Sequence, residues 1–583
     1  MTSLITEPQL LTAAAGNIAD LGSEISQAKA AAAGPTIGVL AAAADEVSVV
    51  TARLFGGYAQ EFQAVLAQAA AFHEQFVAAL ASAANAYAAA EAANVSAISG
   101  ALGLPTSSAP KALTPLVVQP TLQGTTTGLV MGGSGQPLPP PDDVSSSLNY
   151  VNLHFNVLPS NATALVTPEG LYPLTGVKSL TLNVSVSQGL QILDSAIKQQ
   201  LAANPSGSVA VFGLSQSADI ASLEMQNLAN PTLNPTPPSA NQLGFTLVGE
   251  EMTPNGGLLA RFPGFPAGQP LQLPSLGITF YGATPSNTIY PTNIYTLEYD
   301  GFADFPQYPI NVLSDLNAFA GILYVHTNYP GNPSALPSGY AIQQLPTSPG
   351  YTGVTNYYMI TTPNGLPLLD PVRAIPVIGN PIADLLQPDL TTIVNLGYGN
   401  PNFGWSQGPA DVQTYFGVFP HVSPQLIAQD LITGAHQGVT AFVSDIHAEA
   451  SGFSLSSISH SLASMAGGGG VSLPTLTSAV TAGLSPEGII GELQGELTNF
   501  ATGISGSAAN LYAALLPTAD IVNTVVTVLP AYDVNLFLSG IQRAIDGNVL
   551  GGLQYALVAP LAADAGLLTL AGGIELLDLA SAL

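Results

Sequence analysis

The segment Ser208–Glu224 constrains the fold of this chain more than any other. It contains a short β-branched run, then the turn sequence Gly213-Leu-Ser-Gln-Ser217, then an amphipathic helical pattern. This order predicts a strand, a tight turn and a helix, with Ser215 on a nucleophile elbow. The residues two positions before and after the serine must be small, because the helix folds back over the strand. Gly213 and Ser217 meet that requirement.

The charge balance and the cysteine count exclude several classes of function. The chain has 583 residues, with 8 Lys+Arg against 36 Asp+Glu, which gives a formal net charge of −28. Such a surface repels polyanions, so we expect no binding to nucleic acid. Because the chain has no cysteine, it cannot form disulfides, thiolate metal sites or a cysteine nucleophile. We expect no metal and no cofactor.

The amino-terminal 98 residues have the pattern of two helices. Apolar residues recur at spacings of three and four between Pro8 and Ala33, and a second helical pattern runs from Leu54 to Tyr87. Gly34-Pro35 separates the two, so the helices should form an antiparallel hairpin. Because a lone hairpin leaves its outer apolar stripe uncovered, we expect a partner pair of helices.

This hairpin closely resembles the PE domain of mycobacterial PE proteins. The similarity is carried by residues 54–63, 70–77 and 87–94, and it departs from the family at one namesake position, where Pro8-Gln9 replaces Pro-Glu. The resemblance implies pairing with a PPE-type helical partner. It also implies export by a type VII secretion system, with Tyr87 and Glu91 matching the family's Tyr-x-x-x-Asp/Glu signal. The N-terminus has no basic region followed by a continuous apolar run, so it is not an ordinary signal peptide.

A second domain is expected after a Pro/Ser/Thr-rich linker at residues 99–126. From residue 127 to 400 predicted strands alternate with predicted helices, which favours a parallel sheet with helices on both faces. The expected strands are residues 128–131, the run before Ser215, residues 245–248 and residues 294–299, with residues 390–399 as a possible further strand. The Pro/Gly/Asn-rich segment 253–287 is either a mobile lid over an apolar pocket or an ordinary packed insertion.

The remaining residues, 401–583, form a Gly/Ala-rich and mainly helical extension of unknown role. No window of about 18 consecutive apolar residues occurs in the chain, so no membrane-spanning helix is expected. The predicted fold class is therefore multidomain: an all-α hairpin, an α/β domain and a helical tail.

A serine hydroxyl needs a histidine to take its proton and a carboxylate to orient that histidine. After Ser215 the first histidine is His326, and two aspartates lie between them at positions 300 and 304. We favour Asp304, because a loop beyond the strand can curl its carboxylate back toward the histidine. Asp300, at the end of the predicted strand, is the alternative acid.

The oxyanion formed during acyl transfer needs hydrogen-bond donors near the serine. The backbone N–H of Gln216 should supply one, since it follows the nucleophile at the start of the helix. The loop Gly132–Ser134, after the first predicted strand, is placed to supply another. The same glycines are equally compatible with a simple tight turn.

Four blocks in order resemble the PE-PPE domain, a serine α/β-hydrolase related to cutinases. They are residues 130–137, 212–217, 299–306 and 326–329, and the resemblance covers roughly residues 127–400. It implies esterase, lipase or acyltransferase activity with a triad of Ser215, Asp304 and His326. A serine at position 217 is normal in that family.

These observations predict a secreted or cell-surface serine esterase or lipase that cleaves carboxylic esters. If a lipid or sugar hydroxyl replaces water, the same triad would transfer the acyl group to an envelope lipid. The alternative belongs to another class: a catalytically silent surface interaction protein on a hydrolase scaffold, because a fold alone does not prove an activity.

Overall fold

A computed structural model of the chain describes residues 119–265, 269–375, 378–452 and 515–582. The expected hairpin of residues 1–98, with Tyr87 and Glu91, lies outside these residues, as does the linker up to residue 118. The described residues belong to a compact unit that runs from Thr114 to the end of the chain.

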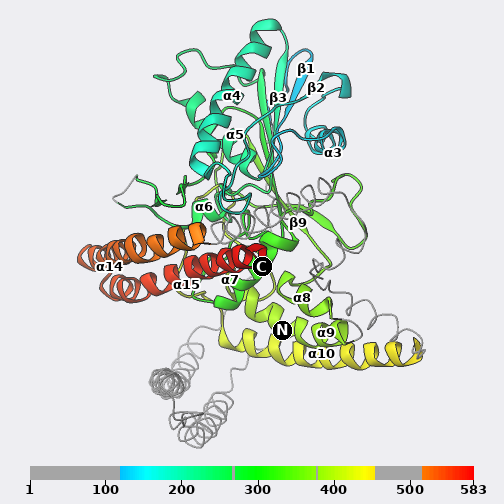
Figure 1. Cartoon of the computed structure of the whole chain (residues 1–583), viewed down its shortest axis with the longest axis vertical. Helices are drawn as coiled ribbons and strands as arrows, with labels where there is room; N and C mark the ends of the chain where they lie inside the picture. The colour runs from blue at the N-terminus through cyan, green and yellow to red at the C-terminus, as the bar shows by residue number, and fades with distance from the viewer. Residues whose placement is uncertain (1–118, 266–268, 376–377, 453–514, 583) are drawn as a thin grey trace, which may run out of the picture. The chain divides into compact units, whose positions relative to one another are not determined.

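A seven-stranded sheet organises the α/β part of the molecule (Figure 1). Neighbouring strands are parallel, except that β8 runs antiparallel to β9 at one edge. In spatial order the strands are β2 (Ala162–Ala164), β1 (Thr126–Val130), β3 (Ser208–Leu214), β4 (Leu243–Val248), β7 (Thr292–Leu297), β9 (Thr355–Thr361) and β8 (Ala341–Gln344). The expected mostly parallel sheet is confirmed.

Helices cover both faces of this sheet, as the side chains of β3 show. Val209 and Val211 pack into a cluster with residues of helices α4 (Leu182–Ala203) and α5 (Gln216–Ala229). Ala210 and Phe212, on the opposite face, pack with residues of helix α3 (Pro141–Val151). Because both faces are covered, β4 and β7 are buried along their whole length, with no alternation of buried and exposed residues.

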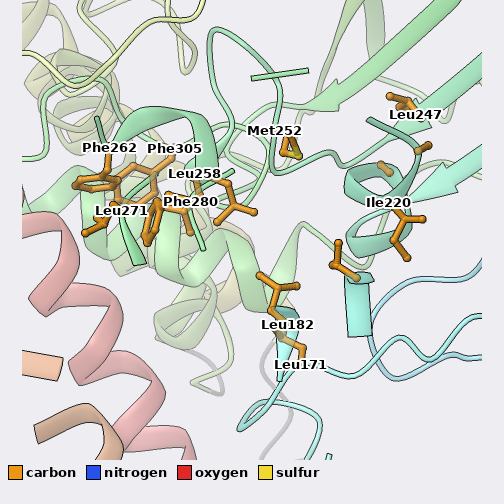
Figure 2. Packing of buried hydrophobic residues seen from close by; sticks show 14 of the residues in the cluster. Leu171, Leu182, Ile220, Leu247, Met252, Leu258, Phe262, Leu271, Phe280 and Phe305 are labelled. Atoms are coloured by element: carbon orange, nitrogen blue, oxygen red, sulfur yellow. The ribbon is translucent and has the colours of Figure 1, made fainter. Parts of the chain in front are cut away.

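The segment 253–287, apart from the undescribed residues 266–268, is packed against the rest of the molecule. It contains the short helix α6 (Leu258–Arg261) and the antiparallel strands β5 (Gln272–Leu273) and β6 (Ile278–Thr279). Phe262 and Leu271 are buried, and Figure 2 shows them beside Phe280 and Phe305. Of the two expectations for this segment, the structure has the packed insertion.

Residues 390–399 do not form a strand, which corrects the expectation from their apolar run. They lie in and just after helix α9 (Gly379–Leu396). The carbonyls of Ile393 and Val394, in its last turn, accept hydrogen bonds from Asn311 Nδ2 (2.7 Å) and Ser314 Oγ (2.6 Å). A short apolar run cannot distinguish a strand from a buried helical segment, and here the tertiary contacts decide.

Other helices complete the described part of the chain. Helix α7 (Val312–Tyr324) precedes strands β8 and β9 in the sequence. A long helix, α10 (Pro424–Gly452), packs on α9. Short helical turns are found at η1 (Pro159–Asn161), η2 (Pro367–Leu369) and α8 (Asp370–Arg373).

The C-terminal helices form a hairpin. A helix that begins at Leu515 passes through a π-helical turn, η3 (Thr524–Val528), into α14 (Leu529–Ile545), and α15 (Val549–Ala582) packs along it. Gly540 lets the two backbones approach, since a Cβ there would lie 2.3 Å from the backbone nitrogen of Ala556. By length and composition, the helices Leu515–Ile545 and Val549–Asp578 are each able to cross a membrane. The sequence expectation considered only uninterrupted apolar runs, and length and composition alone do not decide whether either helix spans a membrane.

Candidate active site

Ser215 lies at the turn between β3 and α5, as the sequence predicts. Its backbone has φ +56° and ψ −130°, a conformation that a residue with a side chain rarely adopts. A Cβ at Gly213 would lie 2.7 Å from Ala218 Cα, so only glycine fits where the helix crosses the strand. On the other side, the Ser217 hydroxyl accepts a hydrogen bond from the Leu214 N–H at 2.8 Å. Both small residues therefore serve the tight turn.

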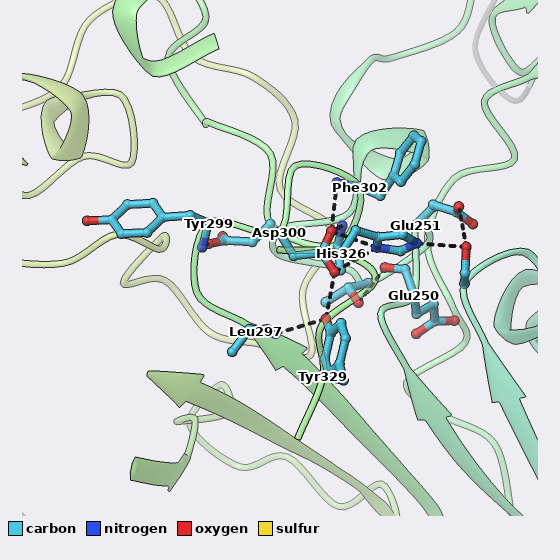
Figure 3. A network of polar contacts seen from close by, with 12 residues as sticks. Glu250, Glu251, Leu297, Tyr299, Asp300, Phe302, His326 and Tyr329 are labelled. Carbon is cyan, nitrogen blue, oxygen red and sulfur yellow. Dashed lines mark hydrogen bonds and ion pairs between the residues drawn. The ribbon is translucent and has the colours of Figure 1, made fainter. Parts of the chain in front are cut away.

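The imidazole of His326 lies between the serine and an aspartate. His326 Nε2 is 2.8 Å from Ser215 Oγ, and Nδ1 is 2.8 and 2.9 Å from the two oxygens of Asp300. Figure 3 shows the contact between Asp300 and His326. His326 follows α7, and all three side chains are buried. The structure thus brings together a hydroxyl, an imidazole and a carboxylate that lie far apart in the sequence.

Asp300, rather than the favoured Asp304, contacts the histidine. It comes three residues after β7, where the loop turns sharply at Tyr299, with φ +65°. Its carboxylate also accepts hydrogen bonds from the Tyr329 hydroxyl (2.7 Å) and from the backbone N–H groups of Phe302 and Ala303 (3.1 and 3.3 Å). These donors leave Asp300 with a single orientation toward His326.

Asp304 has a different environment. Its backbone N–H donates to the Asp300 carbonyl, so the loop turns the Asp304 side chain inward, where Oδ2 accepts from the Tyr299 N–H at 3.2 Å. Burial raises the pKa of Asp304 well above its ordinary value, although the Tyr299 hydrogen bond and the guanidinium of Arg261 oppose this effect. The prediction that Asp304 contacts His326 is therefore wrong, because the loop turns the Asp304 carboxylate toward the Tyr299 N–H and Asp300 takes the place beside the imidazole.

The pKa of His326 reflects two opposed influences. Burial favours the neutral imidazole and lowers the pKa, but the charge of Asp300 and its hydrogen bond to Nδ1 more than offset this, so the pKa is raised. The Phe302 ring packs edge-on against the imidazole, with ring centroids 4.8 Å apart. The aspartate thus stabilises the positive imidazolium that forms when a histidine takes a proton.

Gln216 and Ser134 meet beside Ser215. Gln216 Nε2 donates to Ser134 Oγ at 3.2 Å and to the Gly170 carbonyl at 2.8 Å, while its Oε1 accepts from Ser185 Oγ at 2.6 Å. These bonds fix the first residue of α5, whose backbone N–H has no acceptor within the helix. A Cβ at Gly133 would lie 3.3 Å from Ser215 Cβ, so the glycine loop runs close against the serine.

A group of carboxyls near Ser215 was not predicted from the sequence. Glu251 Oε1 lies 3.4 Å from Ser215 Oγ, and Glu250 accepts hydrogen bonds from Ser222 and Thr284. Burial raises the pKa of Glu250 to about 7 and that of Glu169 to about 8, and it raises the pKa of Asp219 well above its ordinary value. Their position in the sequence could have indicated this group. Glu250 and Glu251 follow β4 after a single glycine, at the edge of the sheet where the parallel strands end.

Two protein families match the chain. The PE-PPE domain matches residues 159–399, and the PE family matches residues 4–94. The first segment contains the serine, the histidine and both aspartates. The second segment lies outside the described residues.

Curated relatives from Mycobacterium tuberculosis strain H37Rv match over most of the chain. Esterase PE16 is 44% identical over 431 residues, which cover 73% of this chain and 74% of the relative. PE family protein PE3 is 44% identical over 443 residues, which cover 76% and 88% respectively. Uncharacterized PPE family protein PPE28 is 47% identical over 465 residues, and these span 78% of this chain and 66% of PPE28.

Solved structures give weaker matches. A cutinase-like protein from Cryptococcus sp. is 17% identical, with a TM-score of 0.21, over 32% of this chain and 82% of that protein. An acetylxylan esterase is 19% identical, with a TM-score of 0.18, over 25% and 76% respectively.

Proposed function

This chain belongs to the mycobacterial PE family and carries a PE-PPE domain, and from that premise we propose that it is a serine carboxylic ester hydrolase. The observation that carries the proposal is the pair of 2.8 Å contacts that His326 makes with Ser215 Oγ and with Asp300. A relative that is 44% identical bears the name esterase, which supports the same reaction class. The proposed activity belongs to the PE-PPE region, residues 159–399, and not to the PE region, residues 4–94.

The residues would act in two steps. Ser215 Oγ attacks the ester carbonyl while His326 Nε2 takes its proton, and Asp300 holds the imidazole and stabilises its positive form. His326 then gives the proton to the leaving alkoxide, so an alcohol departs and an acyl-serine remains. Water, deprotonated by His326, attacks the acyl-serine and releases the acid. The Gln216 N–H and the loop at Ser134 are the proposed donors to the oxyanion.

The same acyl-serine would also react with an alcohol in place of water, which would make the protein an acyltransferase on envelope lipids. Offering alcohol acceptors to the trapped acyl-enzyme separates the two outcomes. Transfer is supported if an acyl-acceptor product forms in competition with the free acid. If water alone consumes the acyl-enzyme, the protein is a hydrolase for those acceptors.

Labelling by a fluorophosphonate tests the nucleophile directly, because this reagent bonds covalently to an activated serine. We expect the wild-type protein and the Ser160→Ala variant, which changes an exposed serine, to label equally. The Ser215→Ala variant should not label, and its ester hydrolysis should fall by about 10⁶-fold. If the wild-type protein takes no label and cleaves no ester, the protein is a silent interaction protein on a hydrolase scaffold and the proposal fails.

We further propose that residues 1–98 pair with a PPE-type helical partner and direct export by a type VII system to the cell wall or surface. Membership of the PE family and the 47% identity to a PPE family protein support the pairing. Deletion of residues 1–98 should abolish export while ester cleavage persists in the purified protein. A Tyr87→Ala variant that is exported as well as the wild type would contradict the proposed role of the Tyr87 and Glu91 signal.

A further inference from the structure

An apolar cavity opens beside the proposed catalytic serine. Two side chains belong to both the site and the cavity wall: Glu251, which contacts Ser215, and Phe302, which packs on His326. Apart from Glu251, Tyr172 and Thr524, every lining residue is apolar. An ester carbonyl bound at Ser215 would therefore have an apolar space next to it.

The C-terminal hairpin supplies one wall of this cavity. The opposite wall comes from the α/β part of the chain and includes Leu171 and Leu182, which Figure 2 shows side by side, and Leu258. The hairpin contributes a row of apolar side chains: Ile521, Val525, Leu567, Leu570, Ala571 and Ile574. These residues lie more than 100 positions beyond residue 399, where the PE-PPE match ends.

Polar contacts hold the hairpin in this place. The Tyr172 hydroxyl donates to Asp520 Oδ2 at 2.7 Å, and Ser275 Oγ donates to the Asp520 carbonyl at 2.9 Å. Farther along, the Tyr532 hydroxyl donates to the Pro263 carbonyl at 2.8 Å. Leu529, Leu567 and Leu570 are buried in the same cluster as the core residues of the sheet. The hairpin is thus a packed part of the site.

The size and lining of the cavity indicate its ligand. Its volume is about 120 Å³. An apolar cavity of about 150 Å³, lined by Leu, Ile and Phe, holds benzene. We propose that the C-terminal hairpin, which lies beyond the PE-PPE match, is the wall that limits the length of the apolar chain the cavity accepts, with room for about six carbons. The proposal rests on the esterase function.

The apolar chain in the cavity could belong to the acyl group or to the alcohol of the ester. Two series of substrates distinguish these two possibilities. The first series varies the acyl chain of 4-nitrophenyl esters, and the second varies the alkyl chain of n-alkyl acetates. In one of the two, kcat/KM should rise by about fourfold for each added methylene that the cavity buries. The rise should stop near six carbons. Flat profiles in both series would overturn the proposal.

A pair of neighbouring substitutions on α15 tests the role of the hairpin. Ala571 lines the cavity, whereas a Cβ at Gly572 would meet open space. In the Ala571→Phe variant, the ratio of kcat/KM for the six-carbon ester to that for the two-carbon ester should fall on the order of 10- to 100-fold, because three or so methylenes lose their site. The matched Gly572→Phe variant should keep the wild-type ratio. An unchanged ratio in Ala571→Phe would overturn the proposal.

Two further measurements separate the proposed effect from misfolding of a variant and from a protein that has no esterase activity. Ile574→Ala enlarges the cavity, so its preferred chain should lengthen, and a folding defect would not produce that result. Binding of ethyl hexanoate to the Ser215→Ala protein, measured by calorimetry, should weaken when Ala571→Phe is added. If wild-type protein neither labels nor cleaves the two-carbon ester, the esterase function fails. Failure of the chain-length effects alone leaves that function standing and removes only the cavity proposal.

Discussion

The sheet region, from Thr126 to Thr361, and the C-terminal hairpin, from Leu515 to Ala582, use opposite means to shape one site. The sheet region buries polar groups, and at the candidate site it fixes Asp300 with four partners. The hairpin meets it mainly through apolar side chains, with a few hydrogen bonds such as that from Tyr172 to Asp520. It also leaves apolar side chains exposed to solvent, with Leu550 81% and Val526 67% exposed. The comparison teaches that, for the function proposed above, the reacting groups and the wall that limits the substrate chain come from different segments of the protein.

Substitution of the orienting acid should give the largest effect and should be independent of chain length. In Asp300→Asn, His326 is held in the wrong tautomer, so kcat should fall on the order of 10⁴-fold for every ester. The matched Asp304→Asn variant keeps an oxygen for the Tyr299 N–H and should retain activity within about tenfold of wild type. Steady-state kinetics with a two-carbon and a six-carbon ester make the measurement. A larger loss in Asp304→Asn than in Asp300→Asn would reverse the assignment.

The second prediction asks whether the hairpin unfolds with the sheet region. Leu536 is fully buried in the cluster that joins them, and Leu536→Ala should lower the free energy of unfolding by about 2–5 kcal/mol. The single tryptophan, Trp405, reports on the rest of the unit by fluorescence, while circular dichroism reports on the helices. Both transitions should shift together. Separate transitions would show that the hairpin unfolds alone, and the exposed Leu538→Ala variant should change neither.

The third prediction concerns pH, since the buried carboxyls belong to the sheet region. Burial raises the pKa of Glu250 from 4.5 to about 7, so the folded state holds its proton more tightly than the unfolded state does. This contribution is complete below pH 4.5 and is lost as the pH rises to 7, amounting to roughly 3 kcal/mol. Denaturant unfolding should show greater stability at pH 4.5 than at pH 7. Glu250→Gln should make the profile less steep without flattening it, because burial also raises the pKa of Glu169 and Glu298. An equally steep profile in that variant would remove Glu250 as a contributor.

Local patterns in the sequence were sufficient for much of the fold and for two residues of the site. The strand and helix around Ser215 and the parallel sheet follow from periodicity and from the small residues Gly213 and Ser217. His326 follows from its order in the chain. Each of these inferences depends on the backbone near the residue concerned.

The triad acid and the cavity wall could not be predicted from the sequence, because both depend on contacts between segments or loops that the spacing of residues does not show. Asp300 and Asp304 are separated by one loop, and the Tyr299 turn decides which carboxylate faces His326. Strand β9 contains aromatic and β-branched residues, which favour a strand, whereas the apolar run at 390–399 is mostly helical. The cavity wall from α15 depends on packing across more than 200 residues, which no spacing reports.

The backbone of Ser215 has one further consequence. A positive φ in a residue with a side chain costs about 1–3 kcal/mol, and glycine would adopt it without that cost. Ser215→Gly should therefore produce a more heat-resistant but chemically inert protein. Directed evolution of this protein for robustness alone would select against the proposed nucleophile, so any such screen must reward turnover as well.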